Sequence, residues 1–261
     1  MNLDLTNKNA LVGGGSKGLG KATAIELAKL GANITLISRS EGRLQTALLD
    51  LPKAAHQMHD YLVADSADSV DLRKKVLQLL QQKPIHILIK NTGGPKGGPI
   101  MDASPVEFIQ AFNNHLICNH LLTQLVTDGM KEAGYGRIIN ITSTSIRQPI
   151  PGLGVSNTTR GAVASWAKTM SLELAPFGIT INNILPGTTY TSRIEEIISA
   201  RADKQSVPYE QIEEQFRTQI PMGRFATPKE IGAVVAFIAS PAASYITGTS
   251  IPVDGGRIRS I

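Results

Sequence analysis

The sequence predicts a doubly wound α/β fold, in which a parallel β-sheet carries helices on both faces. Short apolar runs alternate along the chain with longer amphipathic stretches, as expected for parallel strands joined by crossover helices. The first apolar run, residues 10–12, is followed by a glycine-rich turn and an amphipathic stretch over 21–30. A strand, a glycine turn and a helix in this order are typical of the first unit of such folds.

The same reading extends along the rest of the chain. Strands are predicted at 10–12, 33–37, 61–64, 85–89, 136–141 and 179–185. Helices are predicted at 21–30, 41–49, 68–82, 104–132, 155–175, 191–219 and 228–239. Residues 85–89 are almost continuously apolar, which indicates a strand buried on both faces. Because no linker or internal repeat interrupts the pattern, we expect a single domain over residues 1–261.

Composition narrows the function classes. The chain has 261 residues, of which 42% are hydrophobic, as is ordinary for one globular domain. The single cysteine, Cys118, excludes an internal disulfide and a multi-cysteine metal site, so we expect a reducing compartment and no bound metal. No apolar run reaches the roughly 18 residues of a membrane span, and the N-terminus lacks signal-peptide features. We therefore expect a cytoplasmic protein without a membrane partner.

The net charge of +5 comes from scattered basic residues, of which only Lys74 and Lys75 form a tight pair. Aromatic residues make up 5% of the chain, so a basic face with stacking aromatics is not expected, and neither is nucleic-acid binding. Scattered surface lysines are the simplest explanation of the charge, and an anionic cofactor or substrate is the alternative.

The glycine turn has the spacing Gly14-x-x-x-Gly18-x-Gly20 between the first strand and the first helix. Glycines there can adopt positive φ and allow the backbone to approach a ligand closely. The start of the helix presents free N–H groups, which suit a pyrophosphate. The turn therefore predicts dinucleotide binding, with a purely structural tight turn as the alternative.

Residues 13–20, Gly-Gly-Gly-Ser-Lys-Gly-Leu-Gly, resemble the Thr-Gly-x-x-x-Gly-x-Gly motif of the short-chain dehydrogenase/reductase family, with Gly13 in place of Thr. The resemblance continues to the C-terminus and looks closest to the 3-oxoacyl-(acyl-carrier-protein) reductases. It implies a Rossmann-type, seven-stranded parallel sheet whose last strand lies near 245–256. It also implies a substrate-covering segment at about 188–220, a small-molecule substrate, and assembly as a homotetramer or homodimer.

The end of the second predicted strand bears on the choice of cofactor. An acidic residue at this point selects NAD, whereas an arginine nearby accommodates the 2′-phosphate of NADP. Here Ser38 stands at the acidic position, Arg39 follows it, and Lys17 adds a positive charge in the turn. The sequence predicts NADP(H), and NAD(H) is the alternative. With the resemblance, the expected cofactor-binding residues are Gly14, Ser16, Lys17, Gly18, Leu19, Gly20, Ser38, Arg39, Asp65, Asn91, Gly93, Arg160, Pro186, Gly187, Thr189 and Thr191.

The catalytic stretch departs from the family. The resemblance implies a Ser, a Tyr thirteen residues later, a Lys four residues after that, and a supporting Asn. Ser143 matches the serine, but Ser156 stands at the tyrosine position and Arg160 at the lysine position. The asparagine position falls on His115, or on Asn113 or Asn114 if the helix register differs.

This departure has a chemical consequence. A serine hydroxyl is a far weaker acid than a phenol, and a guanidinium does not exchange protons as a lysine does. Arg160 can still hold ribose hydroxyls and stabilise a developing oxyanion. Since a general acid usually contributes about 10²–10⁴-fold, we expect slow reduction of an ordinary ketone. His115 and Tyr190 are the candidate replacement donors, against a packed helix histidine and a surface aromatic as the alternatives.

The sequence thus predicts an atypical NADP(H)-dependent oxidoreductase acting on a small carbonyl, an alcohol or a 3-oxoacyl substrate. Its candidate catalytic residues are Ser143, Ser156, Arg160 and His115. The alternative from another class is a weakly active or inactive dinucleotide-binding sensor or scaffold, and a non-redox reaction in the same pocket is a third. The retained Ser143 and the full-length covering segment favour the enzyme.

Overall fold

The computed structural model describes residues 1–260 and contains one seven-stranded sheet in which every pair of neighbouring strands is parallel. The strands are β1 (Asn9–Gly13), β2 (Asn33–Ser38), β3 (Asp60–Val63), β4 (Ile87–Lys90), β5 (Gly136–Ile141), β6 (Ile179–Pro186) and β7 (Ser250–Val253). Their order across the sheet is β3-β2-β1-β4-β5-β6-β7. The predicted doubly wound fold is confirmed, and so is the last strand near the C-terminus.

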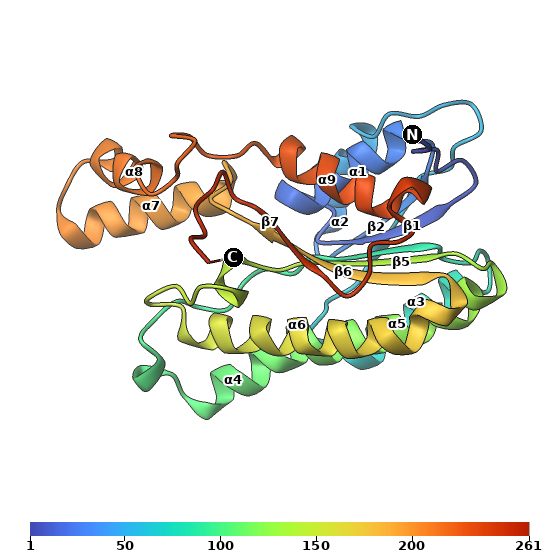
Figure 1. Cartoon of the computed structure of the whole chain (residues 1–261), viewed down its shortest axis with the longest axis horizontal. Helices are drawn as coiled ribbons and strands as arrows, with labels where there is room; N and C mark the ends of the chain where they lie inside the picture. The colour runs from blue at the N-terminus through green and yellow to red at the C-terminus, as the bar shows by residue number, and fades with distance from the viewer. Residues whose placement is uncertain (261) are drawn as a thin grey trace.

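Helices cover both faces of the sheet (Figure 1). The α-helices are α1 (Gly18–Lys29), α2 (Glu41–Leu49), α3 (Ser69–Leu80), α4 (Pro105–Phe112), α5 (Cys118–Glu132), α6 (Gly154–Leu174), α7 (Ser192–Gln205), α8 (Tyr209–Arg217) and α9 (Pro228–Ala239). Helices α1, α2 and α9 lie on one face, and α3, α5 and α6 lie on the other. None of the helices in residues 1–260 is both long and apolar enough to span a bilayer.

The two cores follow from the alternation of side chains along each strand. In β1, Val12 packs with Leu27 of α1 and Val235 of α9 on one face of the sheet. Its neighbour Leu11 packs with Val126 of α5 on the other face. Successive side chains of a strand point to opposite faces, so an apolar run such as that of β1 or β4 supplies both cores at once.

The single helix predicted over 104–132 is divided into three parts. Helix α4 begins with a capping box, in which Ser104 and Glu107 each accept a hydrogen bond from the other's backbone N–H. A π-helical turn, Asn113–Ile117, then separates α4 from α5. A π turn inserts an extra residue into the helical repeat and shifts the following side chains around the axis. The sequence shows no glycine or proline that would predict it.

The predicted helix over 191–219 is also divided, into α7 and α8. Ser206 ends α7 in the left-handed conformation (φ 53°), and Pro208 precedes α8. Proline cannot continue a helix because it lacks a backbone N–H, so the break has a local cause. The two helices share a small apolar cluster around Ile198 and Ile212 that is separate from the two cores of the sheet.

The strand order places a change of direction between β1 and β4. From β1 the chain moves outward to β2 and β3, and then returns to add β4 on the other side of β1. The connections leaving β1 and β4 therefore diverge at the carboxyl edge of the sheet. In doubly wound folds, ligands bind in the crevice that this divergence opens.

Candidate functional site

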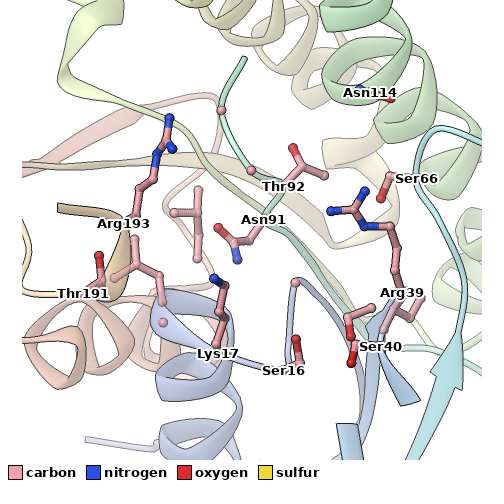
Figure 2. Close-up of a pocket in the computed structure, with 18 of the residues that line it drawn as sticks. Ser16, Lys17, Arg39, Ser40, Ser66, Asn91, Thr92, Asn114, Thr191 and Arg193 are labelled. Carbon is pink, nitrogen blue, oxygen red and sulfur yellow. The ribbon is translucent and has the colours of Figure 1, made fainter. Parts of the chain in front are cut away.

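A cavity of about 570 Å³ lies at this carboxyl edge, across the ends of β2, β1, β4 and β5 (Figure 2). Its lining residues are Gly14, Ser16, Lys17, Gly18, Leu19, Ile37, Ser38, Arg39, Ser40, Arg43, Ala64, Asp65, Ser66, Asn91, Thr92, Gly93, Gly94, Asn114, Ile141, Thr142, Arg160, Thr191, Ser192 and Arg193. They come from eight segments that are separated in the sequence. This volume lies within the range of about 300–1,000 Å³ that is common for small-molecule and cofactor pockets.

The glycine turn forms the floor of the cavity. Gly14 has φ +59°, and a Cβ there would lie 2.6 Å from the carbonyl oxygen of Asn91. Gly20 packs so closely on the carbonyl of Gly14 that a side chain would collide with it. Gly18 also has positive φ (+55°) and opens α1, where the cap residue Lys17 makes no side-chain capping bond. The first N–H groups of α1 are therefore free for an anionic ligand such as a pyrophosphate.

The end of β2 forms a basic side of the cavity. The guanidinium of Arg39 lies 3.8 Å from the carboxylate of Asp65, at the end of β3, and its side chain is 78% exposed. Arg43 in the first turn of α2 lines the same side. Ser38 also lines the cavity, and its hydroxyl is buried without a hydrogen-bond partner among the described residues. Two guanidinium groups and an unpartnered hydroxyl fit the phosphorylated ribose of NADP.

Arg160 stands at the opposite end of the cavity, next to the end of β5. Its Nε donates to Ser156 Oγ (3.3 Å), and its Nη1 donates to the carbonyl of Ile141 (3.4 Å). Ser156 lies one helical turn before Arg160 in α6, which explains the contact between them. Burial lowers the pKa of Arg160 to about 10, so the group is still a cation at neutral pH. The site therefore holds a fixed positive charge where β5 ends.

His115 lies in the π-helical turn behind this end of the cavity. Its Nδ1 is 2.6 Å from the Thr92 hydroxyl, and Thr92 itself lines the cavity. Burial, with a smaller contribution from the charge of Arg160, lowers the pKa of His115 to about 4. The imidazole is therefore neutral at physiological pH, which argues against the expectation that it supplies a proton.

Most of the residues predicted for the cofactor meet in the cavity. Those that line it are Gly14, Ser16, Lys17, Gly18, Leu19, Ser38, Arg39, Asp65, Asn91, Gly93, Arg160 and Thr191. The predicted cofactor residues outside its lining are Gly20, Pro186, Gly187 and Thr189, and the candidate catalytic residues outside it are Ser143, Ser156 and His115. Gly187 is explained by packing, because a Cβ there would lie 2.6 Å from the Cα of Asp254.

Tyr190 does not line the cavity either. Its side chain is half exposed, and its ring lies 6.3 Å from that of Phe225, beside a second pocket of about 360 Å³. Neither of the two candidate replacement proton donors, His115 and Tyr190, therefore lines the cavity.

Ser143 accepts a hydrogen bond from the N–H of Ser145, which leaves the hydroxyl hydrogen of Ser143 available.

Several lining residues were missed by the sequence analysis, among them Arg43, Thr92, Thr142 and Arg193. Arg43 had a usable signal, since it stands four residues after Arg39 at the start of a predicted helix. Arg193 likewise follows Thr191 at the start of α7. Asn114 was predicted only as an alternative to His115 for the supporting asparagine, and in the structure Asn114 lines the cavity whereas His115 does not.

The comparison with known proteins gives the family. Residues 14–257 match the family model described as enoyl-(acyl carrier protein) reductase. The chain belongs to the short-chain dehydrogenase/reductase family. A tropinone reductase homologue of Arabidopsis thaliana is 30% identical over 97% of this chain and 76% of its own length. The NADPH-dependent reductase BacG of Bacillus subtilis is 27% identical over 98% of this chain and all of its own.

Solved structures of other short-chain dehydrogenases/reductases agree with the fold. L-sorbose reductase from Gluconobacter frateurii, crystallised with NADPH and L-sorbose, superposes with a TM-score of 0.94 at 26% identity, and each chain is fully covered. YwfH, an NADPH-dependent reductase of bacilysin biosynthesis, gives 0.92 at 28% identity, over 98% of this chain and all of its own. The predicted resemblance to this family is confirmed.

Proposed function

We propose that this short-chain dehydrogenase/reductase is an NADP(H)-dependent oxidoreductase that reduces a small carbonyl compound. The observation that carries the proposal is the pair Arg39 and Arg43, which lines the same cavity as the glycine turn. Two of the similar reductases, BacG and L-sorbose reductase, are described with NADPH, and this supports NADP(H) over the alternative NAD(H).

The cavity suggests a role for each of its ends. The N–H groups at the start of α1 would hold the diphosphate, Arg39 and Arg43 the 2′-phosphate, and Asp65 the adenine. Arg160 would hold the ribose at the nicotinamide end, and Thr191 and Arg193 would close over the phosphates from the start of α7. When bound, the cofactor supplies the hydride, while the protein positions the reactants and stabilises developing charge.

Residues 188–220 would cover the substrate. Helices α7 and α8 extend beyond the sheet and pack mainly on each other (Figure 1). Ser143, at the end of β5, would polarise the substrate carbonyl with its available hydroxyl hydrogen. Homologues of this chain are described as reductases or dehydrogenases, which favours the enzyme over the sensor or scaffold.

The first test is a titration with NADPH and with NADH, in which the fluorescence of Trp166 reports binding. The second test measures the oxidation of bound NADPH by ketones and by 3-oxoacyl thioesters. We expect tighter binding of NADPH than of NADH, and turnover with at least one carbonyl compound. Tight binding without any turnover would favour the sensor or scaffold. Failure to bind either dinucleotide would overturn the proposal.

A further inference from the structure

The covering segment, residues 188–220, makes polar contacts with the rest of the protein only near its two ends. Its helices α7 and α8 pack on each other around Ile198 and Ile212. Within residues 1–260, no salt bridge joins the segment to a residue outside it. In the same part of the chain, every hydrogen bond that leaves the segment involves residues 188–190 or 219–220. The position of α7 and α8 over the cavity therefore depends on how these two ends are held.

The start of the segment pairs with the chain that follows its end. The N–H of Ala226 donates to the carbonyl of Thr188 (3.0 Å), and the N–H of Tyr190 donates to the carbonyl of Ala226 (2.8 Å). The segment thus leaves the body of the protein and returns to it at nearly the same place.

The chain after β7 runs back to this place (Figure 1). The N–H of Gly187 donates to the carbonyl of Val253 (2.9 Å), and the N–H of Met222 donates to the carbonyl of Gly255 (3.2 Å). Gly255 packs so closely on Ile220 that a Cβ would lie 2.9 Å from its Cγ2. The C-terminal turn, residues 254–258, therefore contacts the chain on both sides of the covering segment.

This turn fixes the backbone around Arg257. The carboxylate of Asp254 accepts hydrogen bonds from the N–H groups of Gly256 (3.0 Å) and Ile258 (2.7 Å), which flank Arg257. The N–H of Arg257 itself donates to the carbonyl of Asp254 (3.3 Å). The direction in which the Arg257 side chain leaves the turn is therefore well determined.

The guanidinium of Arg257 contacts both ends of the covering segment. Its Nη1 donates to the hydroxyl of Thr188 (3.3 Å), and its Nη2 donates to the side-chain carbonyl of Gln219 (3.0 Å). A planar guanidinium presents donors in a rigid fork and can bind two acceptors at a fixed separation, whereas a lysine ammonium is a single point charge on a flexible stem.

We propose that Arg257 is a positioning residue that holds the two ends of the covering segment together, so that α7 and α8 close over the substrate as one body. This inference rests on the proposed function, because the segment is proposed to cover the substrate. Arg257 lies outside the lining of the cavity and acts through Thr188 and Gln219. Holding the ends together limits the conformations open to the segment, so less of the free energy of substrate binding is needed to close it.

The first experiment needs neither substrate nor cofactor. Arg257→Met keeps an apolar stem and removes the guanidinium. We expect its amide exchange, followed by mass spectrometry, to rise in α7 and α8 while the strands stay protected. Arg259→Met, at an exposed arginine two residues away, is the matched control and should exchange as the unsubstituted protein does. Unchanged exchange in α7 and α8 of Arg257→Met would overturn the assignment.

A second variant removes the same contact from the other side. The Gln219 side chain is exposed, so Gln219→Leu leaves the packing of the segment intact. It should give part of the effect of Arg257→Met, and the exposed Gln215→Leu in α8 should give none. Adding Gln219→Leu to Arg257→Met should cause little further exchange, because the contact is already lost. Full additivity of the two substitutions would contradict the proposal.

Steady-state kinetics separate positioning from a general loss of stability. The substrate is the ketone or 3-oxoacyl thioester that the unsubstituted protein reduces fastest. For Arg257→Met we expect KM to rise about tenfold, as for loss of a hydrogen bond to a charged group. The kcat should change little, because saturating substrate keeps the segment closed. Arg257→Lys should recover part of the loss.

Loss of folded protein would instead lower kcat at constant KM, and that result would overturn the inference. A KM effect confined to anionic substrates would also overturn it, because Arg257 would then bind the substrate itself. Absence of turnover or of dinucleotide binding in the unsubstituted protein would count against the proposed function. The exchange experiments on Arg257 and Gln219 do not depend on either, so the two failures are distinguishable.

Discussion

At the scale of single residues, Arg39 and Arg43 carry the choice of cofactor. Replacing Arg39 by Glu puts a negative charge where the 2′-phosphate is expected, next to Asp65. We expect the NADPH dissociation constant to rise by about 10–100-fold, with each tenfold step worth about 1.4 kcal/mol. NADH has no 2′-phosphate, so its affinity should change little. Parallel titrations of Arg39→Glu and the remote control Arg73→Glu measure this, and equal loss for NADPH and NADH would contradict it.

Lys90 is the other residue whose position is unusual. It ends β4, one residue before the cavity-lining Asn91, and is only 4% exposed. Its ammonium lies 4.0 Å from the centre of the Trp166 ring, donates to the Thr123 hydroxyl (3.0 Å) and approaches the carbonyl of Asn119 (3.4 Å). No carboxylate pairs with it within residues 1–260. Burial therefore lowers the pKa of Lys90 well below its ordinary 10.5.

This pKa shift makes stability depend on pH. The unfolded chain binds a proton at Lys90 up to about pH 10.5, whereas the folded protein releases it at lower pH. The free energy of unfolding should therefore rise with pH between the two pKa values. Lys90→Met should abolish this rise. The free energy of unfolding of the variant minus that of the unsubstituted protein should therefore be larger at pH 7 than near pH 10. Urea unfolding at several pH values tests this against the exposed control Lys74→Met, and parallel pH profiles of Lys90→Met and the unsubstituted protein would contradict it.

At the scale of elements, the start of α9 depends on one carboxylate. Glu230 accepts two hydrogen bonds from Arg224 (2.6 and 2.9 Å) and one from the N–H of Thr227 (2.8 Å). The bonds from Arg224, and then that from Thr227, lower the pKa of Glu230 from 4.5 to about 2. The side chain is 42% exposed, so solvent screens much of this interaction.

We expect Glu230→Gln to lower the free energy of unfolding by about 1 kcal/mol at neutral pH, as for loss of a capping interaction. The contribution is complete above pH 4.5 and is lost as the pH falls towards 2, because the unfolded carboxyl group binds its proton first. The difference between Glu230→Gln and the unsubstituted protein should therefore shrink on acidification. Chemical unfolding at pH 7 and pH 3 measures it, with Glu210→Gln in α8 as the control. A difference that does not vary with pH would argue against this role.

Helices α7 and α8 form a unit whose packing is largely their own. Ile212 is fully buried among Ile198 and its neighbours, away from the two cores of the sheet. Truncation of a buried isoleucine to alanine commonly costs about 2–5 kcal/mol. We expect Ile212→Ala to destabilise this unit selectively, so that amide exchange rises in 192–217 while the strands stay protected. Exchange followed by mass spectrometry will show this, and uniform loss of protection across the sheet would disprove it.

At the scale of the whole molecule, charge is distributed unevenly around the cavity. Among residues 1–260, five cationic side chains and one carboxylate line it, whereas the whole chain carries a net charge of only +5. Added salt screens charges over about 10 Å at 0.1 M ionic strength. We expect NADPH affinity to fall more steeply with ionic strength than NADH affinity, because NADPH brings an additional phosphate. Titrations over a series of NaCl concentrations test this, and identical slopes would place the 2′-phosphate away from Arg39 and Arg43.

The local sequence was sufficient to predict the order of the strands and helices and the residues at the adenosine end of the cavity. A short apolar run indicates a strand that is buried on both faces. The positive φ of Gly14 and Gly18 favours glycine at these positions. Each of these two signals lies within a few consecutive residues. Arg39 was predicted because it follows the end of the second strand, and Asp65 was predicted from the resemblance to the family; the structure places the two side chains together. Assembly as a homotetramer or homodimer stays a prediction.

Only the tertiary structure decided how the catalytic end is built. The contact of Arg160 with Ile141 joins a helix to a strand end nineteen residues earlier, and no local pattern specifies it. The π-helical turn places His115 against Thr92, where burial keeps the imidazole neutral. Loop conformation likewise directs Tyr190 towards Phe225. These outcomes depend on how distant segments pack and on the burial that packing imposes, whereas the residue types in a sequence indicate only which chemistry is available.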